Sequence, residues 1–581
     1  MFPSLTRHSD LLVRYLSPQR SRVLLLAVLL FSSIALELIS PQIVRIFIDT
    51  AQRGGPGNAL TVAAALFLAA ALFKQVVALA ATYAGTLTGW QATNALRADL
   101  LQHCLGLDLA FHKDHTPGEL IERIDGDVTL LANFFSQFTI TILGNALLVA
   151  GILVVMVRTN VWLGIGLTVY SLVTVAVLYA FQNRAVVSHT ADRQASAEQY
   201  GAIEERLVGT EDIRGVGAEH YVLERLLSVM RRRLRTSRSA LLAGNLTFFA
   251  INFLYWMAYA LGLAAGAFLF SHHQITLGTA FAIVFYIGML GTPLDKIRLQ
   301  IQDMQQASAC VARVDTLLRT QSRLVATGSE ALPSGALRVQ LEHVNFGYDH
   351  GTSVLNDISL SLDAGQTLGL LGRTGSGKTT LTRLLARLYD PRDGTVRLDG
   401  VDVRNLAAAT MGDRVGMVTQ NVQLFRATVR DNLTFFHPHL MDADILTVFR
   451  ELDLWEWYQS LPNGLDTMLG AGGAGLSAGQ SQLLAFTRVF LRDPGLVILD
   501  EASSRLDPAT ERLVERAIDR LLQGRTGVIV AHRLKTIART DNIMILDGGQ
   551  VAEFGPRLNL VQDPASRFSL LLRTGMEEVL V

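Results

Sequence analysis

A chain of 581 residues is long enough for several domains, but half of its residues are apolar and only 18% are charged, against roughly 25% in an ordinary soluble domain. The 51 basic side chains balance 51 acidic ones, so no global field attracts nucleic acid and we expect no nucleic-acid partner. Two cysteines, Cys104 and Cys310, are too few for a disulfide framework or a thiolate metal site, so we expect both to serve in packing.

Six apolar stretches in the first half are each long enough to cross a bilayer as a helix, which takes roughly 20 residues. The first follows a polar, arginine-containing segment without a cleavage signal, so we interpret it as a retained anchor. Loops after stretches two and four are long and charged, and the latter holds "RRRLR" at 231–235. Because positive residues mark the cytoplasmic side, these loops, the N-terminus and everything after stretch six are predicted to be cytoplasmic in a multi-pass plasma or inner membrane protein. The stretches are 23–48, 59–84, 133–157, 161–182, 243–270 and 277–294.

The two long loops also have a helical apolar spacing among their charges, at 87–108 and 186–240. Each is interrupted once, by "HTPGE" at 115–119 and by "GTEDIRGVG" at 209–217. We therefore predict two helical hairpins that continue beyond the membrane, each with a short cross-helix at its far end.

Among the polar residues inside the apolar stretches, four give a hint of function: Glu37, Lys74, Asn245 and Asn252. A charge in the middle of a membrane costs roughly 3 kcal/mol on insertion scales, so it suggests a function. Glu37 would either pair with a cationic substrate or form a structural hydrogen bond, and both readings stay open. Lys74 can extend to an interface, so we interpret it as mainly structural.

From about residue 325 the composition changes to that of an α/β domain with a mainly parallel sheet. After the linker-like "VATGSEALPSG", short β-rich runs such as "QTLGLLG", "LVILDE" and "NIMILDG" alternate with helical segments. We predict a transmembrane domain at 1–320, a linker at 321–336 and a nucleotide-binding domain at 337–581.

A phosphate-binding loop follows the strand "QTLGLL" and precedes the helical "TLTRLLARLY". Its sequence, "GRTGSGKT" at 372–379, fits the G-x-x-x-x-G-K-[ST] pattern in its required strand–loop–helix context. Main-chain N–H groups of such a loop wrap a polyphosphate at a helix N-terminus. Lys378 would reach the β- and γ-phosphates, and the Thr379 hydroxyl would hold Mg²⁺.

A second strand, "LVILDE" at 496–501, is apolar until it ends in two carboxylates. Ligands bind beyond the C-terminal ends of such buried parallel strands. Asp500 would orient the Mg²⁺ shell, and Glu501 would act as the base that polarises the attacking water.

Three motifs in this order resemble the nucleotide-binding domain of an ABC transporter: the loop at 372–379, "LSAGQ" at 476–480 and "AHR" at 531–533. Segments 107–128 and 204–221 resemble the two cytoplasmic regions of the same family's exporter-type membrane domain. The resemblance covers nearly the whole chain. It implies an exporter-like half-transporter, with a membrane all-α six-helix domain followed by an α/β P-loop NTPase domain of the ABC type.

The resemblance also implies ATP and Mg²⁺ as cofactors and an ATPase coupled to transport. In this reading Tyr348 stacks on adenine, Gln420 links Mg²⁺ and the attacking water to the membrane domain, His532 contacts the γ-phosphate, and Asp507 reaches toward a partner subunit. The implied nucleotide-binding residues are Tyr348, Gly372, Thr374, Gly375, Ser376, Gly377, Lys378, Thr379, Thr380, Ser477, Gly479, Gln480 and Asp507. The implied metal ligands are Thr379, Gln420 and Asp500, and the implied catalytic residues are Glu501, His532 and Gln420.

Three departures from the family pattern lie on the surface that this chain would offer to a partner's ATP. Ala478 replaces a glycine of the signature, Arg505 replaces a small residue, and "TMLGAGG" at 467–473 lacks the usual glutamate. A homodimer would carry each departure in both sites, whereas a heterodimer could confine them to one. We therefore predict an obligate heterodimer with a second half-transporter, in which this chain's P-loop and Glu501 meet the partner's signature.

ATP-driven export of an amphipathic or hydrophobic compound, by a protein embedded in the lipid bilayer, is the leading interpretation, with two alternatives. Uptake through the same architecture is one, although importers more often carry the two domains on separate chains. An ATP-gated channel or regulator is the other, and no inserted regulatory domain supports it. DNA-repair ATPases share the nucleotide motifs, but six membrane spans exclude them.

Overall fold

The structure is a computed structural model of a chain that forms two compact units. The first comprises Met1–Leu105 and Pro117–Thr320, and the second Gly106–Thr116 and Gln321–Val581. The second unit therefore includes a short segment that the sequence places in the membrane domain. The structure describes residues 13–132, 143–324, 328–348, 352–420, 422–437, 440–473, 475–500, 508–531 and 537–574.

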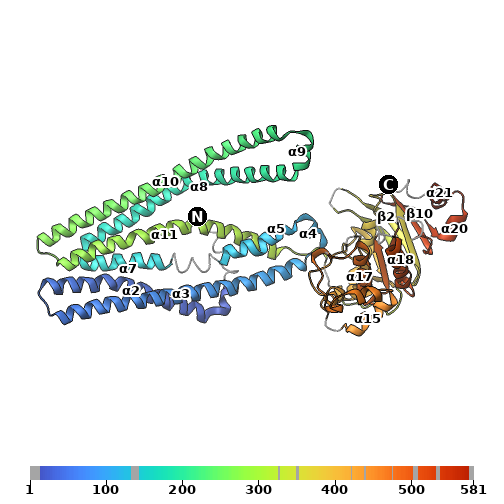
Figure 1. The fold of residues 1–581 in the computed structure, drawn as a ribbon, viewed down its shortest axis with the longest axis horizontal. Coiled ribbons are helices and arrows are strands. Elements are labelled where there is room, and N and C mark those ends of the chain that lie inside the picture. The colour runs from blue at the N-terminus through green and yellow to red at the C-terminus, as the bar shows by residue number, and fades with distance from the viewer. Residues whose placement is uncertain are drawn as a thin grey trace. The chain divides into compact units, whose positions relative to one another are not determined.

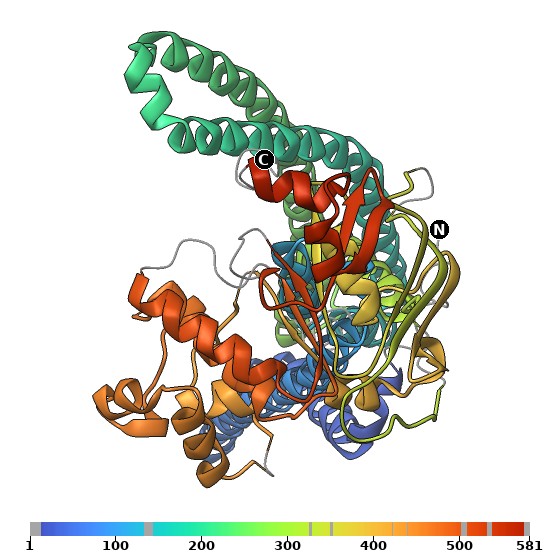
Figure 2. The ribbon, with the colours of Figure 1, turned by 90° about the vertical axis from the view of Figure 1, so that its right-hand side faces the viewer.

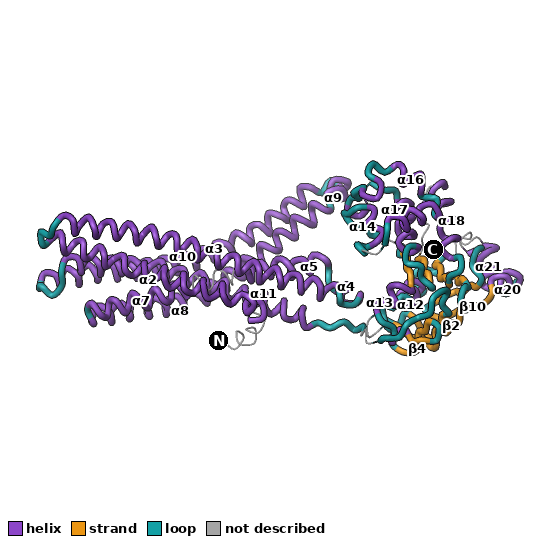
Figure 3. The backbone as a smooth tube through the Cα atoms, turned by 90° about the horizontal axis from the view of Figure 1, so that it is seen from below, coloured by secondary structure: helices purple, strands orange, loops and turns teal. Residues whose placement is uncertain are grey.

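The first unit is helical in its described part, and its long helices run lengthwise side by side (Figures 1 and 3). Neighbouring helices in sequence pack against each other, α2 on α3 and α8 on α10. The elements are η1 (Ser17–Gln19), α2 (Arg20–Gln52), α3 (Gly57–Leu105), α5 (Pro117–Ile121), the π-helix η2 (Glu122–Asp127), α7 (Gly144–Thr159), α8 (Val161–Val208), α9 (Thr210–Val216), α10 (Glu219–Ser271) and α11 (Leu277–Arg319).

The apolar helices match the six predicted stretches in position. Within the described part of the chain, four helical segments are long and apolar enough to cross a membrane, and two shorter apolar helices coincide with stretches three and six. Residues 133–142 of stretch three lie outside the described residues. The four long segments are Val13–Gln52, Gly57–Leu105, Val161–Leu178 and Glu219–Ser271, and the shorter ones are Gly144–Thr159 and Leu277–Pro293.

The predicted helical extensions are present, and a short helix follows each. Helices α8 and α10 form a hairpin with α9 across its tip (Figure 1), and Gly217 ends α9 in the left-handed conformation, φ +67°, which glycine adopts without steric cost. After α3, the short helix α4 (Leu109–Asp114) precedes "HTPGE". Helix α5 begins at Pro117, inside "HTPGE", because the fixed φ of proline suits the first helical position.

Asp49 joins α2 to the start of α11. Its carboxylate accepts hydrogen bonds from the Thr276 hydroxyl and from the Gly278 N–H, both at 2.8 Å, and a negative charge is favourable at a helix N-terminus. The two helices approach so closely that a Cβ on Gly278 would lie 2.4 Å from the Arg45 carbonyl oxygen. Only glycine fits this contact.

An ion pair between a buried carboxylate and a half-exposed arginine joins η2 to α11. Asp127, whose side chain is 2% exposed, accepts two hydrogen bonds from the Arg313 guanidinium, and this pairing raises the pKa of Arg313. Burial first, and then the neighbouring Asp127, raise the pKa of Cys310 to about 11. Cys310 and Cys104 are both buried and form no disulfide within the described part of the chain, as expected for packing residues.

Glu37 and Lys74, two charged residues within the apolar stretches, pair with each other. Lys74 Nζ on α3 lies 3.2 Å from Glu37 Oε1 on α2, and both side chains are about one-third exposed. Asn252 donates to the Phe248 carbonyl one helical turn earlier. The structure thus gives Glu37 a partner within the chain, which the sequence interpretation did not foresee.

The second unit contains two sheets. One sheet has the strand order β10-β9-β3-β8-β7-β6, and its strands are parallel except for β10. The other sheet has the strand order β2-β1-β4-β5, and its strands are antiparallel. The strands are β1 (Val339–Phe346), β2 (Leu355–Leu362), β3 (Thr367–Gly372), β4 (Asp393–Leu398), β5 (Val401–Asp402), β6 (Val415–Val418), β7 (Leu496–Asp500), β8 (Thr526–Val530), β9 (Asn542–Asp547) and β10 (Gln550–Pro556).

Helices surround these sheets (Figure 2), and amphipathic α18 belongs to one of the two main cores. The helices are α4, α12 (Lys378–Leu385), η4 (Val403–Asn405), α13 (Ala408–Arg414), α14 (Val429–Thr434), α15 (Asp442–Glu451), α16 (Trp455–Ser460), η5 (Gly464–Asp466), η6 (Ala471–Gly473), α17 (Ala478–Phe490), α18 (Pro508–Leu522), α20 (Arg557–Gln562) and α21 (Arg567–Thr574).

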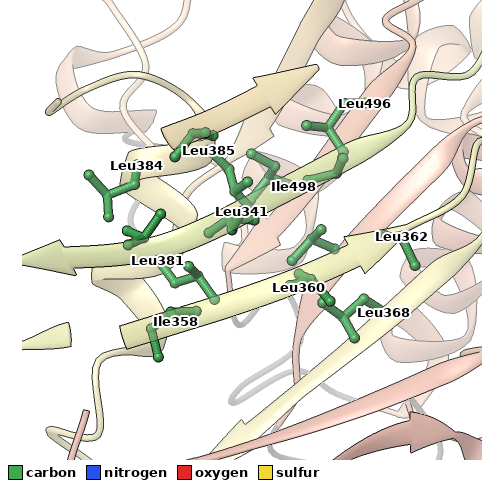
Figure 4. Close-up of a cluster of buried hydrophobic side chains, with 14 of the residues drawn as sticks. Leu341, Ile358, Leu360, Leu362, Leu368, Leu381, Leu384, Leu385, Leu496 and Ile498 are labelled. Atoms are coloured by element: carbon green, nitrogen blue, oxygen red, sulfur yellow. The ribbon is translucent and has the colours of Figure 1, made fainter. Parts of the chain in front are cut away.

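A continuous apolar core fixes the central strand β3 and the helix that follows it. Leu341, Ile358, Leu368, Leu381 and Ile498 are buried together from both sheets and from α12 (Figure 4). Burial of each such side chain contributes about 2 kcal/mol. The core therefore holds the loop between β3 and α12 on a rigid base.

The predicted parallel sheet is confirmed, but the antiparallel sheet was not predicted. The expected strands "QTLGLLG", "GMVTQ" and "LVILDE" correspond to β3, β6 and β7. Strand β2 alternates buried and exposed residues, and its exposed positions are polar or charged. This alternation is a weaker sequence signal for a strand than the fully apolar run of β3. For this reason the antiparallel sheet was not predicted.

Candidate functional site

The P-loop spans the turn between β3 and α12. All six residues of β3 are buried, because β8 and β9 flank it in parallel register. Helix α12 begins at Lys378, and Gly377 before it is left-handed, φ +102°. The loop therefore sits where a strand ends and a helix N-terminus begins, as the sequence predicts.

The glycines of this loop allow a close main-chain cradle. At Gly372, φ is +146° and a Cβ would lie 2.2 Å from the Leu546 carbonyl oxygen, whereas a Cβ on Gly375 would meet nothing within 4 Å. The hydroxyl of Ser376 is buried, and it has no hydrogen-bond partner among the described residues. An unsatisfied buried hydroxyl beside an open glycine turn fits a phosphate group, which would accept its hydrogen bond.

Lys378 is 7% exposed, and its ammonium folds over the loop. Nζ donates to the carbonyl oxygens of Gly372 at 2.6 Å and Arg373 at 3.0 Å. A buried ammonium needs such acceptors to offset its lost hydration. The cation is thus already positioned at the cradle.

Asp500 and Gln420 lie at the same edge of the sheet as the P-loop. Asp500 ends β7 and is 7% exposed, and β8 separates β7 from β3 in the strand order. Gln420 is exposed and lies two residues after β6, which pairs with β7 in parallel. Because parallel strands end at one edge, all three predicted elements converge there.

Tyr348 follows β1 and contacts α12 through its hydroxyl. The hydroxyl lies 3.0 Å from Thr380 Oγ1 and accepts from Arg383 Nη1 at 3.1 Å. Lys113 of α4 places its Nζ 4.4 Å from the centre of the Tyr348 ring, a cation–π distance. The sequence does not predict this contact, because more than two hundred positions separate the two residues.

Asp108 anchors α4 within the second unit. Its carboxylate accepts from the N–H groups of Phe111 at 2.9 Å and Arg323 at 2.5 Å. Burial alone would raise the pKa of Asp108, but these hydrogen bonds and the Arg323 charge together lower it. The segment before α4 is thereby fixed to the start of the linker.

The signature "LSAGQ" forms the N-terminus of α17. Ser477 Oγ accepts from the Gln480 N–H at 3.1 Å, and Gln480 Oε1 accepts from the Ser477 N–H at 2.9 Å, a capping box. Ser477 and Ala478 are exposed, and Gly479 is buried. The Ser477 hydroxyl keeps its own hydrogen free to donate.

Arg488, on α17, is a buried residue that the sequence analysis missed. It donates to the carbonyl oxygens of Asn432 at 2.6 Å and Gln423 at 2.9 Å, and its guanidinium lies 4.5 Å from the centre of the Phe435 ring. Burial first, and then the charge of Arg492, lower the pKa of Arg488 to about 10. Arg488 thus connects the signature helix to the segment after Gln420. A lone arginine in the apolar run "LLAFTRVF" was the available signal.

Four predicted residues lie outside the described part of the chain. They are Glu501, Arg505, Asp507 and His532. Their roles therefore stay predictions from the sequence.

Two protein-family models match the chain. Residues 23–294 match the model described as "ABC transporter transmembrane region". Residues 355–504 match the model described as "ABC transporter". The order of the two matches is the order of the two units.

Curated relatives and solved structures extend this likeness over most of the chain. The chain is 30% identical to a "Fatty acid ABC transporter ATP-binding/permease protein" of Mycobacterium tuberculosis (strain CDC 1551 / Oshkosh), covering 86% of this chain and 79% of the relative. It is 28% identical to a "Putative multidrug export ATP-binding/permease protein" of Bacillus subtilis (strain 168), covering 94% and 95%. A solved bacterial Atm1-family ABC exporter with ATP bound has the same fold, with a TM-score of 0.81, 23% identity and coverage of 96% and 98%.

Proposed function

The chain belongs to the ABC transporter family, as an exporter-type, ATP-driven transporter with an ATPase coupled to transport, and from this premise we propose its substrates, its site residues and its assembly. It exports amphipathic or hydrophobic compounds by alternating access, as one half of a dimer in a cell membrane. The P-loop is the main support for this proposal. Its main-chain turn is open at Gly375, and its buried Ser376 hydroxyl has no hydrogen-bond partner among the described residues.

The residues around the P-loop would hold ATP and Mg²⁺. Main-chain N–H groups of the loop, the Ser376 hydroxyl and the Lys378 ammonium would bind the phosphates, and Tyr348 would stack on adenine. Thr379, Gln420 and Asp500 would hold Mg²⁺, whose preferred ligands are oxygens. When bound, ATP supplies the phosphoanhydride bond whose hydrolysis drives transport.

Two further residues would act on the water and the γ-phosphate. Glu501 would accept a proton from the attacking water at its carboxylate, and His532 would donate a hydrogen bond to the γ-phosphate. Asp500, one residue before Glu501, is buried at the end of β7, so the main chain leading to Glu501 starts from a fixed strand. This supports the assignment of Glu501 as the base.

Export of apolar compounds is supported by the names of two relatives. One is described as a fatty acid transporter and the other as a putative multidrug exporter. Both names point to substrates with large apolar parts. We place the N-terminus and the second unit in the cytoplasm, because the arginine run at 231–235 marks that side.

Pairing with a second half-transporter follows from the single set of nucleotide motifs. Ser477, Gly479, Gln480 and Asp507 would face the partner's nucleotide. The exposed N-terminus of α17 supports this reading, because its Ser477 hydroxyl can donate to a phosphate. The departures at Ala478 and Arg505 favour a heterodimer over a homodimer.

Replacement of Glu501 tests the catalytic assignment. We expect Glu501→Gln to bind ATP normally and to lose roughly 10²- to 10⁴-fold in single-turnover hydrolysis, the scale of a general base. Glu342→Gln removes a half-exposed carboxylate of β1 and should leave the rate unchanged. An unchanged rate in Glu501→Gln would show that Glu501 is not the base.

Purification of this chain alone tests the heterodimer. We expect little substrate-stimulated ATPase from the isolated chain and full activity only with a second half-transporter. A homodimer that drives transport in vesicles would overturn the heterodimer proposal and leave the ATP site unaffected.

A further inference from the structure

A groove of about 590 Å³ lies within the first unit, between α2, α7, α10 and α11. Its volume is in the range of small-molecule sites, roughly 300 to 1,000 Å³. Glu37 of α2 and Leu148 of α7 line it, together with Tyr255 and Tyr259 of α10. The groove thus combines apolar walls with a few polar groups.

One face of α11 forms the long wall of the groove. Phe281, Phe285, Met289, Thr292 and Lys296 line it at intervals of three or four residues, the spacing of a single helical face. From Phe281 to Lys296 the wall is about 22 Å long at 1.5 Å per residue. It begins with two phenylalanines and ends with an ammonium group, so it is amphipathic along its length.

Glu37 does not offer a free negative charge to this groove. Its carboxylate is paired with Lys74 Nζ at 3.2 Å. A cationic ligand that took this carboxylate would leave Lys74 as an unpaired ammonium inside an apolar stretch, at a cost of roughly 3 kcal/mol. The pair therefore opposes cation binding, which the sequence left open for Glu37.

Lys296 offers a positive charge instead. It is exposed, and it forms no ion pair with any residue whose side chain the structure describes. Glu37 and Lys296 are the charged side chains among the described residues that line the groove. With Glu37 neutralised by Lys74, an anion can bind near Lys296 without breaking an existing contact.

We infer that this groove binds amphipathic anions, with an apolar tail along Phe281 and Phe285 and the anionic head group at Lys296. This inference rests on the proposed transport function and names the charge of its substrate. The hydroxyls of Tyr255 and Tyr259 add hydrogen-bond donors. A single acyl chain with a carboxylate has the length and the charge distribution that the wall requires.

Three ligands with the same tail test the sign of the charge. The full chain is purified from membranes in whatever assembly it forms and is placed in nanodiscs of neutral lipid. Equilibrium binding of oleate, oleyl alcohol and oleylamine is then compared without ATP. We expect oleate to bind at least tenfold more tightly than oleylamine, with oleyl alcohol between them. Equal or tighter binding of oleylamine, or no saturable binding of any of the three, would overturn the inference.

Variants assign the preference to Lys296. We expect Lys296→Gln to remove the preference for oleate and Lys296→Glu to reverse it. Asp315→Asn changes a charge farther along α11, outside the residues that line the groove, so it should keep the preference. A tenfold preference that survives in Lys296→Gln would contradict the assignment.

Two further experiments are needed. One identifies the source of the anion, and the other distinguishes a failure of this inference from a failure of the proposed function. If phosphatidylglycerol in the nanodiscs competes with oleate and abolishes its binding, the natural anion is a bilayer lipid. If oleate still binds, the natural anion is a single-chain amphiphile. ATP-driven transport is measured separately with oleyl alcohol and oleate. Transport of the alcohol without an anion preference would refute this inference alone, whereas Lys296-dependent binding without ATP-driven transport would refute the proposed function alone.

Discussion

In the second unit, the buried cations Lys378 and Arg488 donate to main-chain carbonyl oxygens of nearby loops. In the first unit, by contrast, the carboxylates of Asp127 and Glu37 are met by side chains on other helices. Main-chain acceptors survive substitution of neighbouring side chains, whereas a side-chain pair fails when either partner changes. We therefore expect single charge substitutions in the first unit to lower the stability of the protein, and those in the second unit to lower its ATPase rate.

The largest effect is expected at Lys378, because its charge is held at the phosphate cradle. Lys378→Ala should lower the ATPase rate by roughly 10²- to 10³-fold, the scale for loss of one preorganised charge at a reacting group. Arg397→Ala, on β4, removes a side chain that is 40% exposed and should leave the rate unchanged. The measurement is steady-state ATPase of the purified protein, with a thermal melt to verify folding. A large loss of stability without a loss of rate would break the comparison.

The next effect is expected at the ion pair between η2 and α11. Asp127→Asn removes the buried charge that Arg313 faces, but Arg313 is half-exposed and can be hydrated, so the loss should be about 2 kcal/mol, the scale of hydrogen bonds to a charged group. Asp315→Asn breaks the exposed pair with Arg319 on the same helix and should cost less than about 0.5 kcal/mol. The midpoint of thermal unfolding in detergent compares the two variants. Equal shifts would contradict the difference in burial.

A smaller loss of stability is expected at the junction of α2 and α11. Gly278→Ala places a Cβ 2.4 Å from the Arg45 carbonyl oxygen, and such overpacking costs about 1 to 3 kcal/mol. Gly266→Ala meets only Ala280, at 3.9 Å, so it should be neutral or stabilising through helix propensity. Thermal unfolding again gives the measurement, and a stable Gly278→Ala variant would show that the two helices can separate without cost.

The smallest effect is expected at Asp108, and it depends on pH. Because hydrogen bonding lowers its folded pKa below the unfolded value of about 3.9, its contribution is complete above that value and is lost as the pH falls through the folded pKa. Asp108→Asn should therefore lose about 1 kcal/mol at pH 7 and approach the original protein in strong acid. Asp114→Asn, an exposed residue of the same helix, is the control, and a pH-independent difference would refute this account.

The P-loop, the strands β3 and β7 and the ABC fold could be predicted because local patterns determine them. Glycines at fixed spacing and a fully apolar strand are visible in one stretch of sequence. The Lys113–Tyr348 contact and the Glu37–Lys74 pair could not be predicted, because residues far apart in the chain must meet to form them. The antiparallel sheet was missed because the alternating pattern of β2 is a weak signal. For Glu37 this changed the interpretation, since a carboxylate with an internal partner no longer attracts a cation.

ATP-dependent transport in sealed inside-out vesicles tests the central claim most directly. Vesicles from cells that express the chain together with its partner should accumulate a labelled amphiphile only with ATP and Mg²⁺, and Glu501→Gln should reduce the initial rate roughly 10²-fold or more. Accumulation that is equal with and without ATP, or that persists in Glu501→Gln, would contradict the claim that hydrolysis at this chain's P-loop drives export.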